Sequence, residues 1–215
     1  MGWFRRTGGA GAGPPAGEDP GSPTEAEALP ALERTAPGLA ALTRGLTADG
    51  RHTILDLGPA SEPNFRHHAR FARRIRFFDL LVRSPGTGGW AAALEQVPVY
   101  ADHAYDVVLA WNLLDRVGRE ERPEVVKRLV ALAGPGARIH LITDMSGDAL
   151  AHPLRFTLMD DQHVLQEAVS PPVPASPPLL PAEVERLLAP LRVEHAFTLR
   201  HGLREYVAVR PAPPR

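Results

Sequence analysis

The chain has 215 residues, 44% of them hydrophobic, and a formal net charge of −1 at pH 7. This size suits one α/β domain with a tail, and the near-neutral charge argues against a general nucleic-acid-binding protein, whose footprint is strongly basic. The absence of cysteine excludes disulfides, thiolate zinc sites, iron–sulfur clusters and cysteine nucleophiles.

The two ends of the sequence predict tails. Residues 1–22 are rich in Gly, Pro and Ser and almost without aliphatic side chains, so burial cannot repay the cost of ordering them. They have no apolar signal-peptide core, and nowhere does the chain approach the roughly 18 apolar residues of a membrane span. We therefore expect a disordered tail over 1–22, a second short tail over 212–215, a cytoplasmic location and no membrane partner.

A helical segment is predicted over residues 23–48. Leucines recur there at helical spacing, and Pro30 and Pro37 interrupt the pattern, which favours one or two short helices that pack on the following domain.

The next residues predict a strand, a turn and a helix. HTILDLG (52–58) is a nearly continuous apolar run that ends in glycine, as in a strand buried on both faces. Ser61 is a suitable N-cap for a helix, and Pro63 is tolerated in its first turn. The predicted buried face of this helix comprises Phe65, His68, Ala69 and Ala72.

Alternation of strands and helices continues along the chain. Strands are predicted over 74–79, 105–111 and 137–143, with helices from Trp90 and over 122–134 between them. Past Asp148 the sequence is irregular, and 170–181 is a proline-rich connection. A short helix over 182–188 and an antiparallel hairpin around Gly202 complete the pattern. The predicted fold is α/β: a doubly wound, Rossmann-like, mostly parallel sheet with helices on both faces and a C-terminal antiparallel hairpin, over 49–211.

The turn at residues 54–62, ILDLGPASE, carries the most chemistry. A helix N-terminus offers unpaired N–H donors and a partial positive charge, and small residues let a ligand approach the backbone. Asp79 follows Asp56 by 23 residues, about the spacing at which an acid takes the ribose hydroxyls of an adenosine cofactor.

These segments resemble the class I S-adenosylmethionine-dependent methyltransferases over roughly residues 50–210. ILDLGPASE resembles the nucleotide loop of that family, and AYDVVLAWNLLDRV resembles its fourth-strand segment. The terminal hairpin resembles the reversed seventh strand that marks the fold. The resemblance implies S-adenosylmethionine as cofactor, a small-molecule methyl acceptor, and six cofactor-binding positions: Asp56, Gly58, Ala60, Asp79, Trp111 and Asn112.

The sequence also departs from the family pattern. Ala60 replaces the second glycine of the loop and Glu62 the third. The Glu62 carboxylate either turns into the pocket, where it would repel the methionine carboxylate of the cofactor, or points to solvent or contacts the cofactor's ammonium. Pro59 and Pro63 remove two N–H donors. Only about 25 residues, 80–104, separate the second predicted strand from the strand at 105, where the family places a helix, a strand and an adenine-binding acid. Glu95 and Asp102 are the candidates for that acid.

Other polar residues give weaker indications. Asp115 and Arg116 face the usual acceptor pocket, although a solvated surface pair is the simpler interpretation. His67 and His68 are adjacent on a helix and face different ways. His152 and His163 flank a segment suited to a lid, without a carboxylate at metal-ligand spacing, so we predict no metal site. The sequence identifies no catalytic base.

Three functional hypotheses remain open from the sequence. The first is an active methyltransferase, favoured by Asp56, Gly58 and Asp79. The second is a methyltransferase-like domain that has lost cofactor chemistry and serves as a binding or scaffold protein, favoured by Glu62 and the short middle region. The third, a nicotinamide-dependent oxidoreductase, lacks the full Gly-x-Gly-x-x-Gly turn.

Overall fold

The computed structural model describes residues 31–80, 86–99, 104–146, 150–151, 153–168, 173–174 and 176–212. The predicted tail at 1–22 lies outside these residues, as do 213–215 of the second tail, Asp102 and His152. None of the helices in the described ranges is both long and apolar enough to cross a membrane.

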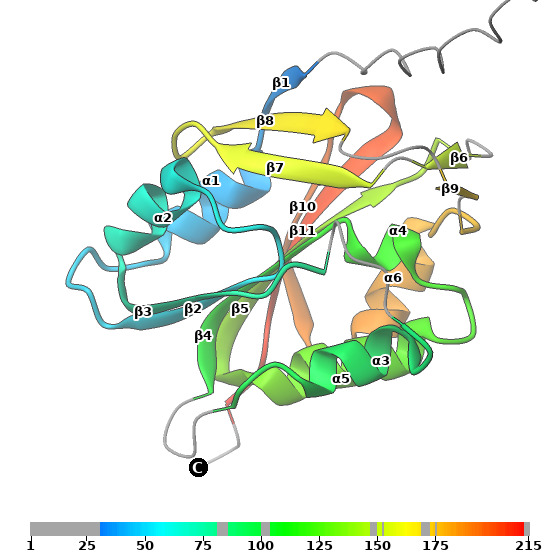
Figure 1. Cartoon of the computed structure of the whole chain (residues 1–215), viewed down its shortest axis with the longest axis horizontal. Coiled ribbons are helices and arrows are strands. Elements are labelled where there is room, and N and C mark those ends of the chain that lie inside the picture. The colour runs from blue at the N-terminus through cyan, green and yellow to red at the C-terminus, as the bar shows by residue number, and fades with distance from the viewer. Residues whose placement is uncertain are drawn as a thin grey trace, which may run out of the picture.

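A six-stranded sheet in the order β10-β11-β5-β4-β2-β3 forms the centre of the fold (Figure 1). β2, β3, β4 and β5 pair in parallel, whereas β11 is antiparallel to both β5 and β10. The predicted doubly wound sheet with a C-terminal hairpin is therefore confirmed. Its strands are β2 (His52–Asp56), β3 (Ala72–Phe77), β4 (Tyr105–Trp111), β5 (Ala133–Asp144), β10 (Arg192–Thr198) and β11 (Leu203–Val209).

Helices cover both faces of this sheet. α1 packs on β5, β10 and β11, and α2 packs on β3, whereas α3, α5 and α6 form a layer on the opposite side (Figure 1). A short 3₁₀ turn, η1 (Arg200–Gly202), joins β10 to β11. The helices are α1 (Pro37–Arg44), α2 (Glu62–Ala69), α3 (Gly89–Glu95), α4 (Leu113–Arg116), α5 (Arg122–Leu132) and α6 (Pro181–Leu188).

A second, three-stranded antiparallel sheet in the order β1-β8-β7 lies over α2 (Figure 1). It corrects two predictions, because residues 32–35 form a strand rather than a helix, and the region past Asp148 contains strands. The Asp160 carboxylate accepts hydrogen bonds from the backbone N–H groups of Gln162 and His163 and so fixes the β7–β8 turn. The strands are β1 (Leu32–Thr35), β7 (Leu154–Leu158) and β8 (His163–Ala168), with a separate pair, β6 (Leu150–Ala151) and β9 (Val173–Pro174).

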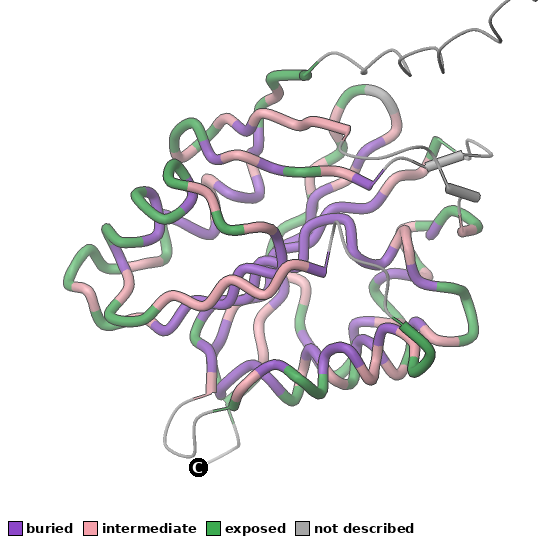
Figure 2. The backbone as a smooth tube through the Cα atoms, viewed as in Figure 1, coloured by how far each residue is buried: buried purple, intermediate pink, exposed green. Residues whose placement is uncertain are grey.

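The buried residues concentrate on the central strands and on the parts of the helices that pack against them (Figure 2). In β4 every residue except Asp106 is buried, as expected of a central parallel strand. In α5 the predicted face of Val125, Leu129 and Leu132 is buried as well.

The buried face of α2 differs from the prediction. Ser61 caps the helix as expected, since its hydroxyl accepts a hydrogen bond from the N–H of Asn64. Phe65, however, is 55% exposed, and the buried residues of the helix are Asn64, His67 and His68. Polar partners on β2, β7 and the β7–β8 turn explain the difference, because a buried polar group is tolerated where it is hydrogen-bonded.

Between β3 and β4 the described residues contain α3 and no strand. This agrees with the sequence argument that the region is too short for both a helix and a strand.

Candidate functional site

The candidate site lies where the carboxyl ends of β2, β3 and β4 meet. From β2 the chain passes through α2 to β3 on one side, and then returns through α3 to β4 on the other. Ligands of doubly wound sheets bind in the crevice at such a switch point. In this chain the place of that crevice is taken by the turn after Asp56 and by the packed residues around Trp111.

Asp56 is the polar centre of this crevice and is fully buried. Its Oδ1 accepts hydrogen bonds from the N–H of Gly58 at 2.9 Å and from Nε1 of Trp111 at 2.6 Å. Its Oδ2 lies 2.9 Å from Nε2 of His68 on α2. Both oxygens are therefore occupied in holding the turn, the helix and the end of β4 together.

Trp111 lies across the glycine of the turn. Its backbone φ is 49°, a left-handed conformation that is rare for a bulky residue. The indole is 1% exposed and stacks on Phe156 of β7, with ring centroids 4.8 Å apart and an interplanar angle of 3°. A Cβ placed on Gly58 would lie 3.2 Å from the indole Nε1. The space above the glycine backbone is thus filled by the chain itself.

Asn64 fixes the position of Phe156, the residue that stacks on the Trp111 indole. Its Nδ2 donates to the carbonyl of Phe156 at 3.0 Å, and its Oδ1 accepts from the N–H of Leu158 at 2.8 Å. The first turn of α2 is in this way fastened to β7, which positions Phe156 on the indole of Trp111.

Asn112 follows Trp111 and is 6% exposed. Among the described residues its buried Oδ1 has no hydrogen-bond partner. A buried acceptor without a partner is costly, and a ligand that donates a hydrogen bond would satisfy it.

Asp79 lies directly beside the turn. The N–H of Phe78 donates to the carbonyl of Asp56 at 2.8 Å, and the N–H of Leu80 donates to that of Leu57 at 2.9 Å. Asp79 is half-buried between them. Its negative charge raises the pKa of Arg116, although burial has the larger, lowering effect on that group.

The loop residues past Gly58 point outward. Ala60 is exposed, and the Glu62 side chain is 79% exposed and forms an ion pair with Arg66 one turn along α2. Of the two orientations that the sequence left open for Glu62, into the pocket or toward solvent, the structure shows the second. Because Asn64 and His68 face inward, the helix turns Glu62 toward solvent.

Glu95, a candidate for the adenine-binding acid, does not belong to the crevice. It ends α3, is exposed, and forms an ion pair with Arg128 on α5. Asp102, the other candidate, lies outside the described residues.

Asp115 and Arg116 are not the solvated pair that the sequence suggested. Oδ2 of Asp115 accepts a hydrogen bond from the N–H of Asp144 at 3.0 Å. Burial raises the pKa of Asp115 to about 8, and the charge of Asp144 adds to that increase. Arg116 donates to the carbonyl of Leu80 at 2.8 Å and covers the ring of Trp90. Asp115 thus joins α4 to the end of β5, and Arg116 joins α4 to the residues after β3 and to α3.

Histidines lie beside Trp111 and around the β7–β8 turn. His140 of β5 meets the indole of Trp111 edge-on, with ring centroids 5.7 Å apart, and burial lowers its pKa to about 4. His67 contacts Asp161 at 2.9 Å, and His163 pairs with Asp160 at the β7–β8 turn. Within the described ranges no group of three or more His, Asp or Glu side chains is arranged to hold a metal ion.

Sequence reasoning missed the partners that close the site, namely His68, His140, Asn64 and Phe156. The one available signal was local: the polar residues 160–162 lie between two strand-like runs and predict a hairpin. Nothing in the sequence indicated that this hairpin would fold over β2 and β4.

Comparison with known proteins finds similarity in structure alone. No protein-family profile matches the chain, and no curated protein matches it. The 1,6-didemethyltoxoflavin-N1-methyltransferase of Burkholderia thailandensis, solved with bound 1,6-didemethyltoxoflavin and S-adenosylhomocysteine, is 16% identical over 82% of this chain and 77% of its own, with a TM-score of 0.49. An S-adenosylmethionine-dependent methyltransferase from Mesorhizobium loti is 14% identical over 79% and 96%, with a TM-score of 0.48.

A third similar structure is the glycopeptide N-methyltransferase MtfA in complex with S-adenosylmethionine. It is 12% identical over 80% of this chain and 92% of its own, with a TM-score of 0.46. At such identities and scores the fold assignment rests on the strand order and the reversed β11 rather than on these likenesses.

Proposed function

We propose that the chain is an S-adenosylmethionine-dependent methyltransferase that acts on a small-molecule acceptor. The observation that carries this proposal is the position of Asp79 beside the Asp56–Gly58 turn, at the switch point of a sheet whose β11 is reversed. An acid at this place is suited to the ribose hydroxyls of an adenosine cofactor. The cytoplasmic location and the absence of a nucleic-acid partner remain predictions from the sequence.

The fit of the methyl donor to these residues is incomplete. Asp79 and the buried Oδ1 of Asn112 offer acceptors at the edge of the crevice. The Trp111 indole, however, lies over Gly58, where a ligand would approach the backbone. We infer that a donor that approaches the Gly58 backbone from the side of the indole requires Trp111 to move.

A second candidate function is a methyltransferase-like domain without methyl-donor chemistry, which serves as a binding partner. The stacking of Trp111 on Phe156 and its hydrogen bond to Asp56 favour this alternative. A site that is closed by the contacts among Trp111, Phe156 and Asp56 is as well suited to a structural role as to cofactor binding.

Calorimetric titration with S-adenosylmethionine and S-adenosylhomocysteine separates the two candidates. Saturable binding by the wild-type chain, weakened in Asp79→Ala and retained in Asp115→Ala, supports the methyltransferase. If the folded wild-type chain binds neither compound, and Trp111→Phe does not bind either, the cofactor proposal fails and the binding-partner role stands.

A further inference from the structure

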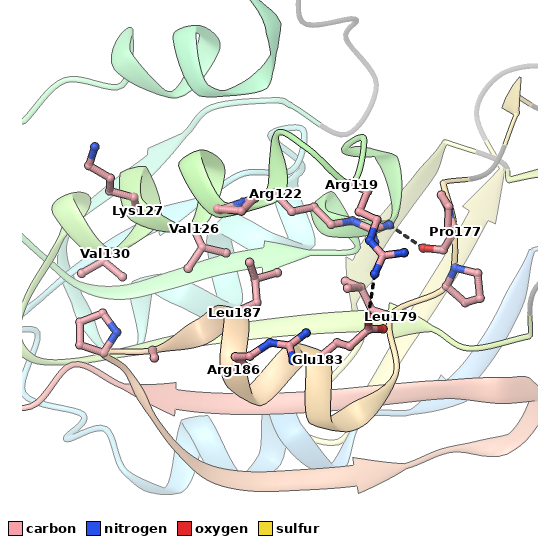
Figure 3. Close-up of a pocket in the computed structure, with 14 residues that line it drawn as sticks. Arg119, Arg122, Val126, Lys127, Val130, Pro177, Leu179, Glu183, Arg186 and Leu187 are labelled. Carbon is pink, nitrogen blue, oxygen red and sulfur yellow. Dashed lines mark hydrogen bonds and ion pairs between the residues drawn. The ribbon is translucent and has the colours of Figure 1, made fainter.

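A pocket lies between α5 and α6 (Figure 3). Its lining does not include Asp56, Gly58 or Trp111. It has a volume of about 710 Å³, within the range of small-molecule sites, about 300–1,000 Å³. Its walls come from both helices, from the proline-rich segment before α6, and from residues 189–190 that follow α6.

The interior of this α5–α6 cleft is apolar. Val126 and Val130 of α5 face Leu187 of α6 across it (Figure 3). Proline contributes no N–H donor, so the four prolines of the lining add apolar surface and few hydrogen-bonding groups. They are Pro123, Pro177, Pro178 and Pro190. Such a wall favours the apolar body of a ligand.

Two contacts fix the width of the cleft at one end. Arg122 is 3% exposed, and its Nε donates to the carbonyls of Leu114 and Val117, both at 3.1 Å, while a terminal nitrogen donates to that of Pro177 at 2.8 Å. Arg119 reaches across to Glu183 on α6 at 3.2 Å. The cleft is bridged there, so it is shaped for a compact molecule rather than for a helix that runs through it.

The charges around the cleft are mostly positive. Four basic side chains line it, Arg119, Arg122, Lys127 and Arg186, against the single carboxylate of Glu183. Arg119 pairs with that carboxylate, and Lys127 pairs with Glu124 on its own helix. Within the part of the chain that the structure describes, no ion pair engages Arg186.

We propose that the α5–α6 cleft binds a small amphipathic anion, a carboxylate with an aliphatic or aromatic body. The apolar body lies between Val126, Val130 and Leu187, and the carboxylate meets Arg186 at the rim. Charge complementarity selects this occupant, because a guanidinium binds a carboxylate in a geometry that a neutral or cationic head group cannot match.

Three probes with the same body and different heads test the proposal on the full chain: 4-phenylbutyrate, 4-phenylbutanol and 4-phenylbutylamine. We expect saturable binding of the carboxylate by calorimetry, at least tenfold weaker binding of the alcohol, and the weakest binding of the amine. Equal affinity for all three, or no saturable binding of the carboxylate, overturns the proposal.

Variants locate the binding. Arg186→Ala is expected to remove the preference for carboxylate over alcohol, and Leu187→Trp to abolish binding of both by filling the cleft. Arg73→Ala, an exposed arginine on β3 at the other edge of the sheet, is the matched control and should bind like the wild type. Circular dichroism and melting temperature establish that each variant is folded.

Unchanged carboxylate affinity in both folded cleft variants would mean that the probe binds elsewhere and would overturn the assignment. The assignment would also be overturned if the wild-type chain bound an acidic amphipathic peptide but not the carboxylate probe, and if Arg186→Ala lost the peptide binding. That result would identify the cleft as a protein-docking surface.

Discussion

Replacement of Trp111 by phenylalanine tests whether the indole competes with the methyl donor. The substitution removes the Nε1 donor that binds Asp56 at 2.6 Å and keeps a ring that can stack on Phe156. It also shortens the side chain on the side of Gly58, where the indole nitrogen lies 3.2 Å from the position that a Cβ on this glycine would take. Asp56 retains its bonds to Gly58 and His68.

The expected magnitude follows from the bond that is removed. A hydrogen bond to a charged group contributes about 1.5–3 kcal/mol, and wild-type binding must break the one between Trp111 and Asp56 before the donor can approach Gly58. Trp111→Phe should therefore tighten S-adenosylhomocysteine binding by roughly tenfold or more. Truncation to alanine is less informative, because loss of a buried tryptophan costs about 3–5 kcal/mol of stability.

Isothermal titration of the wild type and the variant with S-adenosylhomocysteine measures this difference, and thermal melting monitors the fold. Tyr206→Phe, a substitution of a buried aromatic residue on β11, is the control and should leave the affinity unchanged. Equal dissociation constants for wild type and Trp111→Phe would refute the competition argument. Weaker binding by the variant would mean that the indole contacts the cofactor instead of blocking it.

Three further predictions concern single carboxylates. Asp79→Ala should weaken cofactor binding by roughly tenfold or more and Asp115→Ala should weaken it less; a calorimetric comparison that finds equal losses contradicts the ribose assignment. Glu62→Gly should change cofactor affinity by less than about threefold, because the carboxylate is exposed and pairs with Arg66; a tenfold gain would place its charge in the crevice. Burial raises the pKa of Glu205 from 4.5 to about 7, so the folded state keeps this proton to higher pH than the unfolded chain, and wild-type stability falls as pH rises through that interval. Urea unfolding should show that the free energy of unfolding of the wild type, relative to that of Glu205→Gln, falls by about 3 kcal/mol between these two pKa values. A difference between the two proteins that does not change with pH would contradict this titration.

The parts of the fold that could be predicted carry their signal locally. The continuous apolar run of β4 and the amphipathic face of α5 can each be recognised from fewer than a dozen or so consecutive residues, and both elements lie where the sequence predicts them. The reversed hairpin of β10 and β11 is equally local. Parallel order then follows from the alternation of strands and helices.

The arrangement of the site could not be predicted, because it depends on contacts between distant segments. Asn64 is buried since it binds the backbone of β7, 92 and 94 residues away along the chain. That contact sets the rotation of α2, exposing Phe65 and turning Glu62 to solvent. A hydrophobic pattern treats Asn64 as a surface residue and Phe65 as a core residue, so it predicts the rotation wrongly.

Because the site depends on contacts between distant segments, the sequence alone does not decide between the methyltransferase and the binding-partner function. The structure shows which contact to change in order to test them. Asp56, Gly58 and Trp111 are three of the positions that carry the family resemblance, and Gly58 and Trp111 both donate hydrogen bonds to Asp56. The sequence motif shows only that an acid, a glycine and the end of the fourth strand of the family pattern follow one another in the expected order. Whether they form a cofactor site depends on one further property, the position of the indole, which β7 fixes through Phe156. Loosening that single side chain therefore distinguishes an occluded enzyme from a domain that no longer binds the donor.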